Sequence, residues 1–221
     1  MREVVLDTET TGLDPSVGHR IVEIGCVELA NYVPTGKTFH KHLNPERDIP
    51  EQAAAIHGLT EDFLKDQPLF ADIVDGFLEF IGTSTLVIHN AEFDLGFINA
   101  ELETLERLPL KACQVIDTVQ LARRKFPGVP ANLDALCRRF QIDCSDRTLH
   151  GALKDADLLA EVYLQLIGGR QQDLGLATGN CQHDETGPRN RRPPRPHAPT
   201  AEEVQAHARF LKKLEISMWG A

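Results

Sequence analysis

The sequence lacks any long apolar run, which argues against a membrane-embedded protein. No uncharged hydrophobic stretch reaches the roughly 20 residues that a helix needs to cross a bilayer. The N-terminus leads directly into Glu3-Val4-Val5-Leu6, without the basic and then apolar pattern of a secretory signal. We therefore expect no membrane segment and a cytoplasmic location.

Cysteine pairs are also missing. The chain has five cysteines, an odd number, at widely separated positions and with no C-x-x-C pair. A disulfide framework or a structural zinc site is therefore not expected, whereas free thiols in a reducing compartment are. His183 lies close to Cys181, but that polar stretch offers no further metal ligands.

Positive charge is scarce, and the net charge of −10 by itself argues against a dedicated nucleic-acid binder. Residues 1–169 hold 15 of the 23 Lys and Arg but 27 of the 33 Asp and Glu, a balance of −12, whereas the remainder carries +2. An acidic domain can still act on a polyanion if divalent cations lie between its carboxylates and the phosphates. The function must therefore be inferred from motifs.

Short β-rich runs alternate with turn residues in the first part of the chain. They predict strands at 3–8, 20–29 and 37–43, with turns at 12–18 and 32–36. Further strands are predicted at 86–89 and 115–117, and helices at 69–81, 91–107, 119–126, 132–140 and 152–167. This order predicts an α/β fold in which a mixed sheet, an antiparallel meander plus parallel strands, is flanked by helices.

The composition changes after residue 169. Residues 170–199 are rich in Gln, Gly, Arg and Pro, which predicts a flexible linker. Order is expected to return at Thr200, where Thr200-Ala-Glu-Glu203 fits a capping box. An apolar stripe follows through Val204, Ala208, Leu211, Leu214 and Met218. A lone helix is marginal in water, so we expect residues 200–221 to fold against a partner protein, with docking onto domain 1–169 as the alternative.

Two carboxylates stand at the end of the first predicted strand. Because side chains alternate along a strand, Asp7 and Glu9 share one face and Thr8 points away. Two acids at this spacing repel each other unless a cation lies between them. The pair alone is weak evidence, since solvated strand ends often carry such residues.

Two further aspartates lie on apolar faces of predicted helices. Asp94 heads a stripe formed by Phe97, Ile98, Leu102 and Leu105. Asp155 heads another, formed by Leu158, Leu159, Val162, Tyr163 and Leu166, whereas Asp157 has mixed neighbours and is expected to be exposed. A buried charge must be paired or bind metal, because burying it alone costs several kcal/mol. Capping of the helix N-terminus explains an aspartate in the first turn but not its place on the buried face.

His150 lies five residues before Asp155. On one continuous helix it would point roughly 140° away, so the two residues can share a site only if His150 precedes the helix. Gly151 favours such a break. Four acids with no soft-ligand pattern predict a site for two divalent ions, Mg²⁺ or Mn²⁺, and His150 is a suitable base for activating a water.

These motifs resemble those of the DEDDh exonuclease superfamily over residues 3–167. Asp7-x-Glu9, Asp94 within His-Asn-Ala-Glu-Phe-Asp, and His150-x₄-Asp155 match its three motifs in order and spacing. Further matches resemble the epsilon, or proofreading, subunits of bacterial DNA polymerase III: Asp-Thr-Glu-Thr-Thr-Gly at 7–12, Ile-His-Gly-Leu-Thr at 56–60, Asp-Thr at 117–118 and Asn-Leu-Asp-Ala-Leu-Cys at 132–137.

The resemblance implies an RNase H-like fold and removal of 3′-terminal nucleotides from DNA as monophosphates. Asp7, Glu9 and Asp155 would hold one metal, Asp7 would help with the second, Asp94 would act through water, and His150 would be the base. Positions that match residues near the terminal nucleotide are Thr8, His57, Asn90 and Phe93.

The resemblance also implies partners and a location. Residues 200–221 would bind the polymerase alpha subunit, at the bacterial nucleoid. Gln171 to Leu176 resembles a sliding-clamp-binding peptide of the form Q-x-x-L-x-L, although so short a pattern arises easily by chance. Whether the chain binds a small theta-like subunit is left open.

Two other functions compete with this hypothesis. An RNA-trimming DEDDh exonuclease, oligoribonuclease-like or RNase T-like, would share the fold, but it needs neither a tether nor a terminal helix. A non-catalytic adaptor would keep the fold only for binding, and the presence of all five catalytic residue types argues against it.

Overall fold

The computed structural model describes residues 1–111, 114–144, 149–168 and 198–212, and the chain divides into two compact units, Met1–Leu174 and Gly175–Ala221. The first unit is built on a five-stranded sheet in the order β3-β2-β1-β4-β5. Its strands are β1 (Arg2–Thr10), β2 (Ile21–Ala30), β3 (Val33–His42), β4 (Thr85–Ile88) and β5 (Val115–Asp117). β1, β2 and β3 form an antiparallel meander, and β4 and β5 continue the sheet in parallel with β1. The predicted mixed sheet is confirmed.

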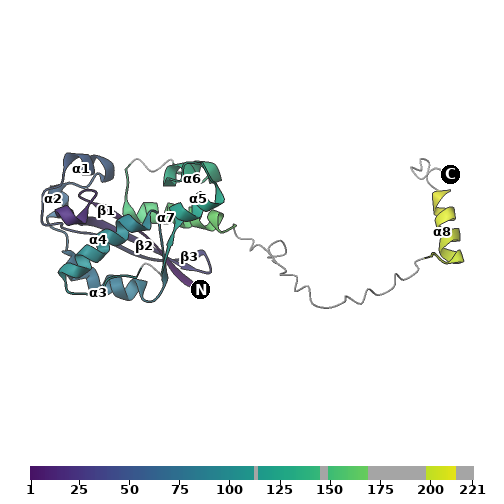
Figure 1. Ribbon diagram of the computed structural model, residues 1–221, viewed down its shortest axis with the longest axis horizontal. Helices are drawn as coiled ribbons and strands as arrows, with labels where there is room; N and C mark the ends of the chain where they lie inside the picture. Colours follow the sequence, from purple (N-terminus) through teal and green to yellow (C-terminus); the bar gives the residue numbers. More distant parts are fainter. Residues whose placement is uncertain (112–113, 145–148, 169–197, 213–221) are drawn as a thin grey trace, which may run out of the picture. The chain divides into compact units, whose positions relative to one another are not determined.

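Helices cover both faces of this sheet (Figure 1). They are α1 (Glu51–His57), α2 (Glu61–Leu64), α3 (Phe70–Ile81), α4 (Ala91–Thr104), α5 (Thr118–Lys125), α6 (Leu133–Phe140) and α7 (Ala152–Leu166). The buried side chains of α3 and α4 pack with Val4 and Leu6 of β1 in one core. Those of α5, α6 and α7 pack with Val5 in a second core. The strand alternation of β1 therefore sends its residues to two separate cores.

The turn between β2 and β3 corrects the sequence prediction. A loop was expected at 32–36, but the chain reverses at Asn31 and Tyr32, whose φ angles are 50° and 68°, and β3 begins immediately afterwards. Two positive φ values match the tight hairpin turns that suit the twist of antiparallel strands. Pro34 and Gly36 suggested a loop. Pro34 fits within β3 because β3 is an edge strand, where a missing N–H is tolerated, and Gly36 takes a positive φ of 84° near the register shift between β2 and β3.

Three short elements were not predicted: α1, α2 and the 3₁₀ helix η1 (Pro15–Val17). Each is 7 residues or shorter, which leaves too little length for a helical apolar period to show. All the longer helices and strands of the first unit were predicted, with boundaries that differ by a few residues, as is usual for helix ends.

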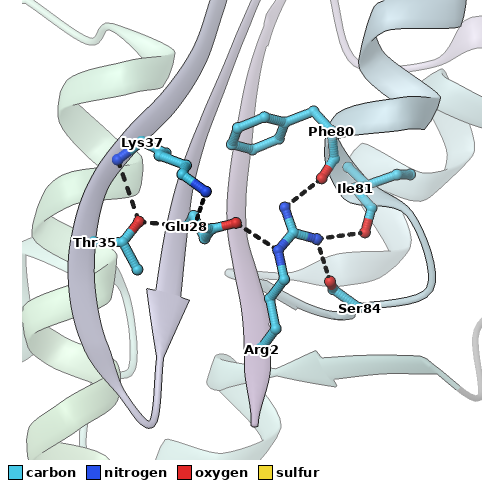
Figure 2. Close-up of polar contacts among 7 residues, drawn as sticks. All are labelled: Arg2, Glu28, Thr35, Lys37, Phe80, Ile81 and Ser84. Carbon is cyan, nitrogen blue, oxygen red and sulfur yellow. Dashed lines mark hydrogen bonds and ion pairs between the residues drawn. The ribbon is translucent and has the colours of Figure 1, made fainter.

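A polar network fastens the start of the chain to the fold (Figure 2). The guanidinium of Arg2 donates to the backbone oxygens of Phe80 and Ile81 at the end of α3, at 2.6 and 3.2 Å, and to Ser84. It also pairs with Glu28 of β2 at 2.5 Å. Glu28 in turn accepts from Thr35 and pairs with Lys37, both of β3. A cation at this helix C-terminus satisfies carbonyls that have no partner within the helix.

In the second unit the structure describes one helix, α8 (Ala201–Leu211). Thr200 and Glu203 form the predicted capping box. No residue of α8 is buried, and Val204 and Phe210 are 51% and 59% exposed. Residues 170–197 of the linker predicted at 170–199, and the clamp-like peptide at 171–176, lie outside the described residues. Within the described part of the chain, no helix has both the length and the apolar character needed to cross a membrane.

Candidate active site

Asp7 and Glu9 of β1 lie on one face of the sheet, and Thr8 lies on the other. Asp7 pairs with Gly25, and Glu9 pairs with Glu23, across the β1–β2 ladder. Thr8, between them, is 6% exposed and points to the opposite face, where α4 packs. The predicted alternation is therefore present.

Helix α4 brings Asp94 to the side of β1 that Thr8 faces. Asn90 precedes the helix with a φ of 66°, and Asp94 lies in its first turn with only 3% of its surface exposed. One carboxylate oxygen of Asp94 accepts two hydrogen bonds from Thr8, from the hydroxyl at 2.7 Å and from the backbone N–H at 3.1 Å. Burial raises the pKa of Asp94 to about 7, although the Thr8 hydrogen bonds act in the opposite direction. Asp117 contributes further to this rise through its negative charge.

Helix α7 approaches β1 from the other face. It begins at Ala152 after an extended Gly151, so His150 precedes the helix as expected. A side-chain carbon at Gly25 would overlap the backbone of Ala152 and Leu153, which shows that the helix start rests directly on the sheet at a glycine. This close approach places Asp155, which is 3% exposed, over the strand that carries Asp7 and Glu9.

His150 lies between the buried carboxylate of Asp155 and the solvent. Its backbone N–H donates to the carbonyl of Ile56 at 3.1 Å, which fixes the segment before α7 against the end of α1. Its Nδ1 lies 3.3 Å from Oδ2 of Asp155, and 46% of its side chain is exposed. Ligand atoms of Glu9, His150 and Asp155 all lie within 4.8 Å of one another.

A pocket of about 310 Å³ collects all five residues that the sequence singled out for catalysis. Its lining is Asp7, Thr8, Glu9, His89, Phe93, Asp94, Asn132, Leu133, Asp134, His150 and Asp155. Two of these acids are buried, and oxygen donors of this kind are the ligands that hard divalent cations prefer. The donor set therefore fits a divalent metal, with His150 as an additional nitrogen near the same point.

The four residues predicted to lie near a terminal nucleotide separate into different places. Thr8 and Phe93 line both this pocket and an adjoining, largely apolar groove of about 700 Å³. His57 lines only the groove. Asn90 lies outside both and lines a third cavity, which Arg123 also lines.

The buried side chain of His57 is held in one orientation. It is 5% exposed, and its Nδ1 accepts a hydrogen bond from the backbone N–H of Leu59 at 3.0 Å. Burial lowers its pKa, which favours the neutral ring. Within the described part of the chain, its Nε2 has no hydrogen-bond partner.

Sequence reasoning missed several pocket residues. Asn132 and Asp134 belong to a motif that was noticed but given no role, and both line the pocket. Asn132 also caps α6 by accepting from the N–H of Ala135 at 2.8 Å. His89 was seen only as part of a motif, and its Nδ1 lies 2.9 Å from the hydroxyl of Thr118.

Comparison with known proteins identifies the class. A family model described as an exonuclease (RNase_T) matches residues 4–163. Exonuclease X in complex with 5′ overhanging duplex DNA has a TM-score of 0.60 and 29% identity, over 75% of this chain and 90% of that one. The nuclease domain of 3′hExo, a DEDDh family member bound to rAMP, has a TM-score of 0.64 at 20% identity, over 75% and 91%. The chain therefore belongs to the exonuclease class that this family model describes, and it shares the fold of these nucleases.

Sequence similarity narrows the assignment within that class. DNA polymerase III subunit epsilon of Rickettsia felis is 52% identical over 222 residues, which is 97% of this chain and 97% of that protein. The chain belongs to the family of DNA polymerase III epsilon subunits.

Proposed function

We propose that this chain proofreads for a bacterial DNA polymerase III by hydrolysing mismatched 3′-terminal nucleotides of DNA and releasing deoxynucleoside monophosphates. The observation that carries the proposal is the single pocket that holds Asp7, Glu9, Asp94, His150 and Asp155. A subunit working at chromosomal primer ends would be cytoplasmic and associated with the nucleoid.

The acids are the metal ligands in this proposal. Asp7, Glu9 and Asp155 would hold one divalent ion, Mg²⁺ or Mn²⁺, and Asp7 would help to hold a second, on which Asp94 would act through water. When bound, two such ions stabilise the charge on the attacking and leaving oxygens of the phosphate. The hydrogen bonds from Thr8 orient the Asp94 carboxylate, because both go to the same oxygen.

His150 is the proposed general base. It is more exposed than the acids around it, so a water can reach its ring, and Nδ1 lies within 3.3 Å of Asp155. That contact orients the imidazole, and Nε2 is the atom proposed to take a proton from the attacking water. The hydrogen bond from its backbone N–H to Ile56 fixes the position of the base.

The apolar groove beside the pocket is the proposed site of the 3′-terminal nucleotides. Leu13, Val17 and Ile56 line it and are 85%, 68% and 52% exposed, while Phe93 lies where groove and pocket meet. Apolar and aromatic surfaces stack bases without reading their sequence. A mismatched end frays at lower cost than a matched one, so the enzyme can select errors through the melting step.

The polymerase alpha subunit is the proposed partner of residues 200–221. α8 begins with a stable capping box, yet exposes Val204 and Phe210. An amphipathic helix with an exposed apolar face typically binds in a groove of another protein. Residues 171–176 are proposed to contact a sliding clamp, on their sequence pattern alone, and a small theta-like subunit remains a candidate partner.

Deletion of residues 200–221 tests the polymerase contact. We expect unchanged hydrolysis of free oligonucleotides and loss of co-purification with the alpha subunit. Thr200→Ala, which removes the cap and costs the helix ~1 kcal/mol, should weaken that binding without abolishing it. Lower nuclease activity of the truncated chain would show instead that the helix belongs to the catalytic unit.

The nuclease assignment is tested with two end-labelled substrates, a primer–template with a 3′ mismatch and a single-stranded RNA. Each is incubated with Mg²⁺ and, as a control, with EDTA. We expect metal-dependent loss of DNA 3′ nucleotides that is faster at the mismatch than at a matched end. Preference for the RNA would make the chain an RNA-trimming enzyme, and cleavage of neither substrate would favour the adaptor.

A further inference from the structure

A second group of potential ligands lies on the β2–β3 side of the sheet. Glu23 of β2 pairs with His42 of β3 in the ladder, and His40 lies two residues before His42 on the same face. Nε2 of His40 is 2.7 Å and Nε2 of His42 is 3.7 Å from the same oxygen of Glu23. One ligand atom from each of the three residues lies within 4.8 Å of the other two. Two imidazoles and a carboxylate thus converge on one point.

The carboxylate of Glu23 is buried, with only 5% of the side chain exposed, although it lies beside two partly exposed histidines. A carboxylate in such a place needs a cation or strong hydrogen bonds to offset its lost hydration. The groups near it include the rings of His40 and His42 and, across the β1–β2 ladder, Glu9. His57 is close enough to interact with it electrostatically. A side-chain carbon built on Gly151 would lie 4.0 Å from both of its oxygens.

The two histidine rings are partly accessible and are held in place. Their side chains are 34% and 26% exposed, so an ion can reach them from solvent. The rings of His40 and His42 meet edge to face with centroids 4.8 Å apart, and Phe63 packs against His42 at 5.0 Å. Two protonated imidazoles at this separation would repel each other, whereas two neutral rings can share a cation. Burial also lowers the pKa of His42, which favours its neutral, ligating form.

We propose that Glu23, His40 and His42 bind a divalent transition metal of the Zn²⁺ type at a site that borders the catalytic pocket through the Glu9–Glu23 pair but shares no residue with its lining. Two nitrogens and one carboxylate oxygen suit Zn²⁺, Co²⁺ or Ni²⁺ better than Mg²⁺, which prefers oxygen ligands alone. The catalytic pocket is rich in carboxylates, and its proposed ions are the hard ones. The two sites therefore select different metals by their donor atoms, and this proposal does not depend on the proofreading function.

A metal at this site would connect the edge strand to the interior of the sheet. It would join β3 to β2 at the end of the meander, next to Gly151, where the segment that carries His150 begins α7. An ion that binds the folded protein and not the unfolded chain raises the unfolding temperature. The first measurable effects are thus stoichiometry and thermal stability.

The test compares the full chain with a His40→Gln/His42→Gln variant, both in an Asp155→Asn background that weakens the catalytic pocket equally in each. Glutamine can still donate to Glu23 but is a poor ligand for Zn²⁺. Lys41→Ala is the matched control, since Lys41 is exposed and lies between the two histidines on the opposite face of β3. Co²⁺ is titrated and followed by its visible absorption, and Zn²⁺ by calorimetry and thermal unfolding.

We expect the parent chain and Lys41→Ala to bind one more ion than the double glutamine variant, and Zn²⁺ to raise their unfolding temperatures further. Loss of an outer partner of a metal ligand typically costs about 10–100-fold in affinity, so Glu23→Gln should weaken binding at this site at least ~100-fold. Equal stoichiometry and equal affinity in the parent and the folded double variant would overturn the proposal and leave Glu23 and His40 as an ion pair. If the double variant does not fold, His42→Gln alone is compared in the same way, and unchanged binding there overturns it equally.

Discussion

Helices α4 and α7 lie on opposite faces of the sheet, yet each supplies a buried aspartate from its first turn to the same pocket. Asp94 and Asp155 are both 3% exposed. Asp94 is enclosed, and Thr8 donates two hydrogen bonds to it, whereas Asp155 contacts the half-exposed ring of His150. Equal burial therefore does not mean equal chemistry. On the α4 face, hydrogen bonds hold the Asp94 carboxylate in one orientation. On the α7 face, the Asp155 carboxylate contacts a partly exposed histidine.

The largest expected effect is on the α7 side. Asp155→Asn should lower the exonuclease rate by ~10³-fold or more, because it removes a proposed metal ligand and the partner of His150 together. Asp157→Asn is the matched control on the same helix, since Asp157 is exposed. Single-turnover hydrolysis of a mismatched primer measures both. A residual rate of one tenth for Asp155→Asn would contradict the metal assignment.

The next effect concerns the contact between α7 and the sheet. Gly25→Ala should push the start of α7 away from β1, because the added methyl overlaps the backbone of Ala152 and Leu153. Overpacking of this kind costs ~1–3 kcal/mol or more, and here it also displaces His150 and Asp155. We expect lower stability in urea unfolding together with a reduced rate. A stable variant with full activity would show that α7 is not held at this glycine.

On the α4 side, we expect Asp94 to make the stability of the folded protein depend on pH. Because burial raises the pKa of Asp94 from 3.8 to about 7, the folded chain binds this proton more tightly than the unfolded chain. In the metal-free protein, the resulting stability is fully present below pH 3.8 and is lost as the pH rises through about 7. Asp94→Asn resembles the protonated acid, so it should raise the unfolding temperature more at pH 8 than at pH 5.

Thermal unfolding in EDTA at both pH values measures this difference. Glu92→Gln is the control, since Glu92 is an exposed acid in the same first turn of α4. An Asp94→Asn shift of the same size at both pH values would show that Asp94 is not protonated in the folded, metal-free state.

The smallest effect is expected from a second glycine. Gly96 lies inside α4, and a side-chain carbon there would meet no atom within 4 Å. Gly96→Ala should therefore stabilise the protein by ~0.5–1 kcal/mol through helix propensity. Urea unfolding of Gly96→Ala and Gly25→Ala measures both changes in unfolding free energy. We expect a rise for Gly96→Ala and a fall for Gly25→Ala, although the chemical change is the same. Destabilisation by Gly96→Ala would reveal a contact on the α4 face that the structure does not show.

Much of the fold could be predicted from sequence because its long elements carry clear periodicity. Asp94 and Asp155 were identified by the apolar residues that follow them, and both are buried. The start of β3 was predicted wrongly, since Pro34 and Gly36 indicate a loop unless the strand is known to be an edge. Whether a strand lies at the edge of a sheet depends on which strands pair, and the local sequence does not indicate this.

The parts of the site that could not be predicted depend on long-range contacts. Strand alternation says that Thr8 points away from Asp7, but not that it meets Asp94, which is 86 positions further along the chain. The backbone bond from His150 to Ile56 is of the same kind, since α1 was not expected at all. The roles of Asp7, Glu9, Asp94, His150 and Asp155 in catalysis stay predictions for the experiments above.

The central place of β1 has a consequence for synthesis on the ribosome. β1 is translated before the other four strands of its sheet, and it is paired on one side by β2 and on the other by β4. Glu3 near its start accepts a hydrogen bond from Tyr163 of α7, 160 positions later. Domains generally fold as units once their sequence has emerged, and long-range contacts form late. The acids of β1 are therefore translated long before His150 and Asp155 exist. A nascent or prematurely terminated chain would carry the β1 acids of the proposed site without its α7 residues, so we expect it to be inactive.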